Sequence, residues 1–220
     1  FSNIPLVHKL FLKMSPYDFD YTIDPGTEYT VFDMRPQDAN RTYTFSVMIC
    51  YEDAVPYMAR KFALDEKGQK QINWLLNISN DGWFVRFEKG KVLPATELSQ
   101  HAAICAFRAV ENRLAVMRSV NTGISCMIDT LGRIKDGYTA GKLPQKAFDR
   151  QGIKGWFADT VPIDARTTFF SKHGQWLDFA CQLYVVVIII SIIIERLIRK
   201  QRTKGEKGSD LNGKEKPSKN

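Results

Sequence analysis

Residues 42–53 read T-Y-T-F-S-V-M-I-C-Y-E-D, and the rest of the fold is interpreted outward from this stretch. From Thr42 to Ile49, aromatic and branched apolar side chains alternate with Thr, Thr, Ser and Met, a period of two that predicts a β-strand. Cys50 follows directly, and residues 56–66 then predict a short helix with its proline at a permitted early position. The sequence therefore places a cysteine at the carboxyl end of a strand, before a turn and a helix.

Predicted strands and helices alternate along the rest of residues 1–175. Residues 1–30 read as a loop, because prolines and a glycine interrupt them. Further elements are expected as strands at 72–78, 114–120, 124–128 and 156–163, a turn at 79–82, and a long helix at 96–113 capped by Thr96. This alternation predicts an α/β fold with a substantial sheet.

An apolar run near the C-terminus predicts a membrane-spanning helix. Residues 176–194 read W-L-D-F-A-C-Q-L-Y-V-V-V-I-I-I-S-I-I-I, with only Asp178, Gln182 and Ser191 strongly polar. At about 1.5 Å per residue this run is about 28 Å long, close to the thickness of a bilayer's hydrocarbon core. Val and Ile also favour strands, but the run is too long for one buried strand. We assign residues 176–198 to a transmembrane helix.

The charges on either side of the span predict its orientation. Five basic residues follow it closely, whereas only Lys172 and His173 precede it; the five are Arg196, Arg199, Lys200, Arg202 and Lys204. Positive charge stays on the cytoplasmic side, so residues 1–175 are expected outside and residues 199–220 inside. The tail is rich in Lys, Gly, Ser and Glu and is expected to be disordered.

Composition excludes several classes of protein. The chain has 220 residues, is 44% hydrophobic and carries a net charge of +7, which is typical of a globular protein and not of a disordered one. Most of the excess charge lies in residues 199–220, so the body has too little to bind a nucleic acid. The sequence shows no metal-ligand spacing, P-loop or dinucleotide motif, and no cofactor is predicted.

Cys50 has the position of a nucleophile. Side chains at the carboxyl ends of strands project into the usual ligand crevice of α/β sheets, and the Tyr51 backbone N–H is placed to meet a developing oxyanion. A thiol with the ordinary pKa is only about 3% ionised at pH 7, so a neighbouring base or cation is needed. The histidines His8, His101 and His173 have no spacing that singles one out, and His101 is expected on a helix face. A buried structural cysteine is the alternative, as expected for Cys105 and Cys126.

Three motifs, in order along the chain, resemble the nitrilase (carbon–nitrogen hydrolase) superfamily. Residues 47–52, V-M-I-C-Y-E, resemble its nucleophile strand, and residues 77–84, N-I-S-N-D-G-W-F, resemble the N-x-S-N-D-x-W-F stretch that follows. Residues 108–113 and 118–123, R-A-V-E-N-R and R-S-V-N-T-G, resemble the R-A-x-E…R-x-x-N-x-G helix and strand. The combination is most similar to the apolipoprotein N-acyltransferases, the membrane branch of the superfamily.

The segment before the span extends this resemblance. Residues 168–176, T-F-F-S-K-H-G-Q-W, resemble the run that leads these acyltransferases into their last span, with Phe170 and Gln175 in place of the usual Tyr and Asp. The resemblance covers about residues 20–198. It implies a nitrilase-like αββα sandwich, present here in part, followed by one transmembrane helix, and a multi-pass protein of the bacterial inner membrane.

The resemblance also implies a Glu-Lys-Cys triad, of which this chain has only the cysteine. The motifs that carry the Glu and the Lys precede the nucleophile in the family, and neither motif is present here. We expect the chain to be the C-terminal part of a longer protein and to be inactive alone.

Site residues carry over one by one. Cys50 matches the acyl-accepting nucleophile, Tyr51 supplies the backbone oxyanion donor, and Glu52 supports the site through hydrogen bonds or, alternatively, pairs with Arg108 or Arg118. Three residues are expected to shape the substrate pocket, namely Asn80, Trp83 and Phe84; the alternatives are turn chemistry for Asn80 and core packing for the two aromatics. Glu111 and Arg118 are interpreted as a buried ionic support.

The function that the resemblance implies is acyl transfer. Cys50 would take an acyl chain from a phospholipid as a thioester and pass it to the N-terminal amine of a diacylglyceryl-modified lipoprotein. Two alternatives remain at this stage. One is a membrane-anchored amidase or nitrilase, in which water resolves the intermediate. The other is a catalytically incomplete binding domain tethered to the membrane.

Overall fold

The computed structural model describes residues 9, 13, 26–37 and 40–212, so most of the predicted N-terminal loop and residues 213–220 lie outside the described part. The strands are β1 (Phe32–Met34), β2 (Tyr43–Ile49), β3 (Trp74–Ser79), β4 (Val85–Glu88), β5 (Lys91–Pro94), β6 (Ala115–Val120), β7 (Cys126–Ile128), β8 (Ile134–Lys135), β9 (Ala140–Gly141) and β10 (Phe157–Ala158). The helices are η1 (Cys50–Ala54), α2 (Pro56–Ala63), η2 (Asp81–Phe84), α3 (Thr96–Asn112), η3 (Ala147–Arg150), α4 (Phe169–His173) and α5 (Trp176–Asn212).

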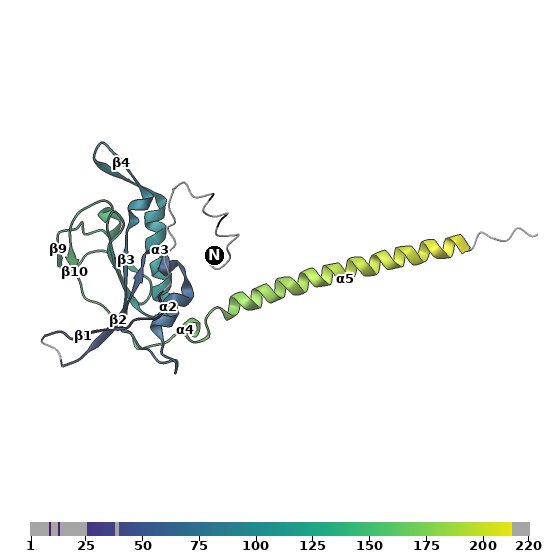
Figure 1. Cartoon of the computed structure of the whole chain (residues 1–220), viewed down its shortest axis with the longest axis horizontal. Helices are drawn as coiled ribbons and strands as arrows, with labels where there is room; N and C mark the ends of the chain where they lie inside the picture. The colour runs from purple at the N-terminus through teal and green to yellow at the C-terminus, as the bar shows by residue number, and fades with distance from the viewer. Residues whose placement is uncertain (1–8, 10–12, 14–25, 38–39, 213–220) are drawn as a thin grey trace, which may run out of the picture.

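A six-stranded mixed sheet organises the domain, in the order β1-β2-β3-β6-β7-β8. Its first three strands are labelled in Figure 1. The three central strands β2, β3 and β6 are parallel, and the outer neighbours pair antiparallel. The carboxyl ends of the three parallel strands therefore meet at one edge of the sheet, where an α/β fold places its ligand crevice. The segments that follow those strands begin with Cys50, Asn80 and Asn121.

The two faces of the sheet are packed differently. On one face α2 and α3 bury the main core, which includes Met48, Leu75, Ala102, Leu114, Val116 and Ile128. On the other face a small cluster around Trp74, Ala115 and Met127 is joined by Val161 from the C-terminal segment. Towards the carboxyl ends of the strands this second face is open, and Ile49 and Ile78 are exposed. The described residues thus form one helical layer on one sheet, as the α/β prediction requires.

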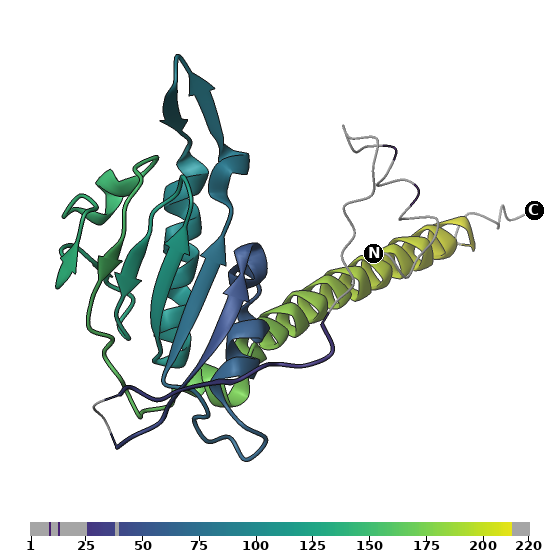
Figure 2. The ribbon, with the colours of Figure 1, turned by 60° about the vertical axis from the view of Figure 1, so that its left-hand side comes forward.

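A hairpin that the sequence reading did not identify projects from the end of the sheet near the parallel strands' carboxyl ends (Figure 2). Strands β4 and β5 pair antiparallel around Lys89 and Gly90, both of which have positive φ angles. Two positive φ angles are the requirement of a type I′ hairpin turn, which is usually encoded by Asn-Gly. A Lys-Gly pair carries that signal only weakly.

Two smaller expectations are wrong in detail. The N-cap of α3 is Ala95, not Thr96, which is the first helical residue and whose hydroxyl contacts Glu97 instead. The strand expected over 156–163 is limited to Phe157 and Ala158, which pair with β9. Residues 159–163 carry a proline and an aspartate, both of which disfavour strands.

The predicted C-terminal apolar helix is confirmed. Within α5, residues Trp176–Lys200 are long and apolar enough to cross a membrane. Their most apolar stretch of 18 residues has a mean hydropathy of 2.5, and none of it is buried against the domain (Figure 1). Helix α5 continues to Asn212, beyond the expected end at residue 198. Lys, Glu, Arg and Gln are good helix formers, and extending an existing helix needs no new nucleus.

Candidate active site

Cys50 stands where β2 passes into the 3-10 turn η1, and its backbone is held in an uncommon conformation. Its φ is +51°, in the left-handed region that non-glycine residues rarely adopt. The Cys50 carbonyl accepts a hydrogen bond of 3.1 Å from the Asn77 amide on β3. The thiol is free and half-buried. Strained backbone of this kind persists only where the surroundings fix it, and it is concentrated at functional sites.

Glu52 bonds within its own turn. Its carboxylate accepts a 2.8 Å hydrogen bond from the backbone N–H of Ile49, so it closes the entry to the turn that carries Cys50. Its alternative partners are engaged elsewhere: Arg108 pairs with Glu111 at 2.8 Å, and Arg118 pairs with two aspartates.

The loops after β3 and β6 are joined to each other by asparagine side chains. Asn121 accepts a 2.9 Å hydrogen bond from the Asp81 backbone N–H and donates one of 2.5 Å to the Asn80 side chain. Asn80 also accepts from Gly82 N–H at 3.1 Å, which makes it the N-cap of η2. Gly123 lies so close to Asp81 that any β-carbon at this position would overlap the carboxylate. Asn80 therefore acts in turn geometry in this structure.

A fully buried ionic network lies beneath these loops. His101 on α3 places Nδ1 3.0 Å from Asp81 and Nε2 3.1 Å from Asp53, and all three side chains have no exposed surface. Arg118 on β6 contacts Asp81 at 2.8 Å and Asp53 at 3.4 Å. Two aspartates, an arginine and a histidine therefore share one buried site.

Neutral groups complete the network. The Arg118 guanidinium donates to the side-chain carbonyl of Asn77 at 2.8 Å, and the same Asn77 amide donates to Cys50. The Cys105 thiol donates to Asp53 at 2.8 Å and accepts from Arg118 at 3.3 Å. These contacts form a continuous chain of hydrogen bonds from the buried arginine to the turn of the predicted nucleophile. Within the described residues no group of three or more His, Cys, Asp or Glu side chains is arranged to hold a metal ion.

The ionisation of the network follows from its partners. Burial would lower the pKa of His101, but the hydrogen bonds to Asp53 and Asp81 raise it to about 9. Burial would raise the pKa of Asp81, but hydrogen bonds from His101 and Ser79 and the charge of Arg118 lower it to about 2. Burial raises the pKa of the Cys105 thiol well above its ordinary value, so it is a neutral donor. With His101 protonated, two positive charges balance two negative ones.

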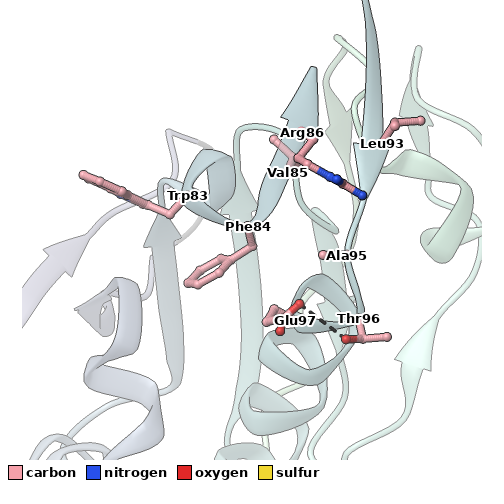
Figure 3. A pocket seen from close by; sticks show the side chains of 8 residues that line it. All are labelled: Trp83, Phe84, Val85, Arg86, Leu93, Ala95, Thr96 and Glu97. Carbon is pink, nitrogen blue, oxygen red and sulfur yellow. Dashed lines mark hydrogen bonds between the residues drawn. The ribbon is translucent and has the colours of Figure 1, made fainter. Parts of the chain in front are cut away.

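Tyr51 connects the network to the predicted pocket residues. Its ring stacks on His101 with centroids 4.5 Å apart and planes within 13°, and the Phe84 ring meets the Tyr51 ring edge-on with centroids 5.7 Å apart. Phe84 and Trp83 line a cavity of about 520 Å³ between the β4–β5 hairpin and the start of α3 (Figure 3). The remaining lining residues are Val85, Arg86, Leu93, Ala95, Thr96 and Glu97. Trp83 is 60% exposed and is not a core residue.

The main omission of the sequence reading is His101. We expected it on an exposed helix face, and it is completely buried. Buried polar residues follow one side of α3 at helical spacing, namely His101, Cys105, Arg108 and Asn112. These polar residues share a face of α3 with Leu98, Ala102 and Ala109, and this pattern indicates a buried polar network. The pattern is missed when every polar residue of a helix is assigned to its exposed face. The prediction of Arg118 as a buried ionic support is confirmed, whereas Glu111 belongs to a separate pair.

Comparison with known proteins finds apolipoprotein N-acyltransferases among the similar curated proteins. No family model matches the chain. Apolipoprotein N-acyltransferase 2 of Treponema denticola is 29% identical over 196 residues, which is 89% of this chain and 32% of the relative. The apolipoprotein N-acyltransferase of Thermotoga maritima is 30% identical over 184 residues, 83% of this chain and 30% of the relative. The chain spans about a third of the length of these curated relatives.

Solved structures with partial similarity come from the carbon–nitrogen hydrolases. Nit3 of Saccharomyces cerevisiae, a member of the nitrilase superfamily, is 20% identical with a TM-score of 0.36 and is matched over 57% of this chain and 40% of its own. An amidase from Nesterenkonia sp. is 16% identical with a TM-score of 0.41, over 70% of this chain and 49% of its own. On the sequence comparisons, this chain is similar, over most of its own length, to about a third of the length of the apolipoprotein N-acyltransferases.

Proposed function

We propose that this chain carries the nucleophile of a membrane-bound N-acyltransferase, which moves an acyl chain from a phospholipid to the N-terminal amine of a diacylglyceryl-modified lipoprotein. The observation that carries the proposal is Cys50, a free and half-buried thiol in a left-handed turn at the carboxyl end of β2. The similarity to acyltransferases over 83–89% of the chain supports the same reaction.

The first half of the reaction forms a thioester. The Cys50 thiolate attacks the ester carbonyl of the phospholipid, and the Tyr51 backbone N–H donates to the oxyanion that develops. Collapse of this intermediate breaks the ester C–O bond, and the lysophospholipid leaves as an alcohol after taking up a proton. The acyl chain remains on the sulfur.

The second half releases the acyl chain to an amine. The neutral α-amine of the lipoprotein attacks the thioester carbonyl, the same N–H stabilises the second oxyanion, and the C–S bond breaks to return the thiolate. The amide product keeps the acyl chain, and the amine's extra proton goes to a base. Glu52 supports both halves by closing the turn through its bond to Ile49. Trp83 and Phe84 border the cavity beside the β4–β5 hairpin, where a substrate chain would enter, and the Phe84 ring also contacts Tyr51.

The remaining members of the triad are proposed to come from the rest of the full protein. The chain spans about a third of its relatives, and a Glu base and a Lys that supports the oxyanion are implied by the family resemblance. We propose that they face Cys50 from the open side of the turn.

Membrane attachment suits this reaction. Both substrates are lipid-anchored, so holding the catalyst in the same bilayer confines the encounter to one interface. Helix α5 is long and apolar enough to provide the anchor. The basic residues that follow its apolar stretch, among them Arg196, Arg199 and Lys200, support a cytoplasmic C-terminus and an external catalytic domain.

The test uses the full-length protein in detergent, with a phospholipid labelled in its acyl chain and a synthetic diacylglyceryl-cysteine peptide. We expect labelled N-acyl peptide and lysophospholipid in equal amounts from the wild type and neither from Cys50→Ala. Cys181→Ser is the matched control, because this exposed free cysteine lies in α5, and it should retain wild-type turnover.

Two results would refute the proposal. Normal acyl transfer by Cys50→Ala would remove the nucleophile assignment. Release of free fatty acid from the phospholipid, or of ammonia from simple amides, with no acylated peptide, would show that water resolves the intermediate. The protein would then be a hydrolase.

A further inference from the structure

We propose that His101 is a positioning residue for the oxyanion donor: bonded to Asp53 and stacked on Tyr51, its imidazolium fixes the orientation of the Tyr51 N–H beside Cys50. This inference rests on the proposed function, because it concerns the same reaction at the same turn. His101 itself does not touch the reacting atoms, since it lies beneath the turn with no exposed surface.

His101 holds the turn at two points, Tyr51 and Asp53, which both follow Cys50 in the sequence. The ring of Tyr51, the residue after Cys50, stacks on the imidazole with centroids 4.5 Å apart. Asp53, two residues further along η1, contacts Nε2 of the same ring at 3.1 Å. Fixing both positions leaves the peptide between Cys50 and Tyr51 little freedom to rotate. That peptide carries the proposed oxyanion donor.

The positions of the two carboxylates around His101 require its ring to be protonated. Each ring nitrogen faces a carboxylate, Nδ1 towards Asp81 at 3.0 Å and Nε2 towards Asp53 at 3.1 Å. A neutral imidazole has one N–H, so one carboxylate would face a lone pair in a buried site. The imidazolium donates in both directions and also attracts the face of the Tyr51 ring. Among the described residues, the other cationic partner of these aspartates is Arg118, which contacts both of them.

The same ring connects the turn to the second loop of the site. Asp81 is the first residue of η2, and its backbone N–H donates to the Asn121 side chain. Phe84, the last residue of η2, packs edge-on against the Tyr51 ring. Among the described residues, His101 is therefore the side chain that contacts Tyr51 and Asp53 in η1 and also Asp81 in η2. The Asn77 amide holds the Cys50 carbonyl, which belongs to the same planar peptide as the Tyr51 N–H, so removing His101 would free this peptide on its Tyr51 side alone.

The experiment compares full-length wild type with His101→Gln, which retains one donor and one acceptor of similar size. Two rates are measured on Cys50: formation of the acyl thioester from phospholipid, and alkylation by iodoacetamide. Acylation needs the oxyanion donor, whereas alkylation at carbon does not. We expect the maximal acylation rate to fall about 10²-fold, the size of effect that a misplaced catalytic group produces, with KM for phospholipid and the alkylation rate each changed less than threefold.

A matched control and a second variant complete the design. His173→Gln changes the exposed histidine that packs on Phe169, outside the network, and should leave both rates unchanged. Tyr51→Leu removes the stack but leaves every bond of the buried network in place. It should slow acylation about tenfold, and combined with His101→Gln it should add less than its separate effect, because the two act through one peptide.

The outcomes separate the two proposals. Acylation at the wild-type rate in His101→Gln, or a fall in alkylation equal to the fall in acylation, would overturn the positioning role alone. If His101→Gln does not fold, wild-type acylation by Tyr51→Leu would overturn it in the same way. Absence of any thioester in the wild type would instead refute the proposed function on which this inference rests.

Discussion

Three of the described arginines are buried, and two of them, Arg118 and Arg150, are held in opposite ways. Arg118, with no exposed surface, meets two aspartates, the Asn77 carbonyl and the Cys105 thiol at the carboxyl ends of the parallel strands. Arg150, 2% exposed, lies among β8, β9 and β10 and donates to four backbone carbonyls, those of Ser125, Gly137, Pro144 and Gln145. Its guanidinium also stacks over Tyr138 and Phe157.

The difference separates a titratable site from a structural clamp. The two aspartate partners of Arg118 ionise and lie in η1 and η2 around Cys50, so these contacts couple charge to the geometry of the turn. The partners of Arg150 are carbonyls and aromatic rings that do not change charge in the physiological range. We therefore expect activity to depend on the first region and only folding to depend on the second.

The largest effect is expected when each arginine is replaced by methionine. Arg118→Met leaves two buried aspartates against one histidine, and breaking a buried ion pair typically costs about 3–5 kcal/mol of unfolding free energy. Chemical denaturation in detergent measures this loss, and thioester formation per folded molecule should fall at least 10²-fold. Arg150→Met should also destabilise the domain but keep thioester formation per folded molecule within about threefold of wild type. Equal losses of activity in the two variants would remove the distinction.

The next largest effect is a pH dependence of the unfolding free energy, which we expect from the groups around Arg118 and not from those around Arg150. His101 has its pKa raised to about 9 from an ordinary value of 6.5, so its stabilising contribution is complete below pH 6.5 and is lost as the pH rises through 9. This pKa shift corresponds to about 3 kcal/mol of unfolding free energy. Asp81, with its pKa lowered to about 2, contributes fully above pH 3.8 and loses that contribution as the pH falls through 2.

Denaturation curves between pH 5 and pH 10 check this expectation. The wild type should lose stability between pH 6.5 and 10 by more than His101→Gln does, since other groups titrate equally in both proteins. Parallel curves for the two proteins would show that the buried ring is neutral throughout.

Much of the fold was predictable because its signals are local. The period of two over residues 42–49, the apolar run over 176–194 and the motifs around Cys50 and Asp81 each lie within a short stretch of sequence. The buried network was not predictable in this way. Asp53, His101 and Arg118 come from a turn, a helix and a strand, and only the parallel pairing of β2, β3 and β6 brings them together.

The β4–β5 hairpin and the end of α5 show two other reasons why a structure was not predicted from the sequence. The β4–β5 turn uses Lys89 where asparagine is the usual residue, so its positive φ was not signalled. Composition alone made residues 199–212 appear disordered, but they continue a helix that already exists, which is a property of the neighbouring segment.

A smaller effect distinguishes two asparagines at opposite ends of β3. The Asn77 amide holds the carbonyls of Met48 and Cys50, and Asn73, just before β3, accepts from the Thr44 N–H at 2.8 Å. Each change to Ala should cost about 1–3 kcal/mol, because buried partners lose their hydrogen bonds. Only Asn77→Ala should also slow acylation of Cys50. A matching slowdown in Asn73→Ala would show that any loosening of β2 is sufficient.

The smallest effect is expected at an exposed arginine. Arg133 pairs with Asp129 at 2.6 Å, but its side chain is 74% exposed. Exposed pairs contribute little, so Arg133→Ala should change the unfolding free energy by about 0.5 kcal/mol or less and leave acylation unchanged. A loss comparable with that of Arg118→Met would contradict the view that burial and partners, not the residue type, set the effect.

The most direct measurement concerns the sulfur of Cys50. Full-length protein is incubated with a phospholipid of defined acyl chain, digested without reducing agent, and the Cys50 peptide is analysed by mass spectrometry with and without the diacylglyceryl-cysteine peptide. We predict that the Cys50 peptide gains the mass of the acyl chain, loses it to hydroxylamine, and loses it to the acceptor peptide. An unmodified Cys50 while acylated acceptor accumulates, or an acyl chain found on a different residue, would contradict the account.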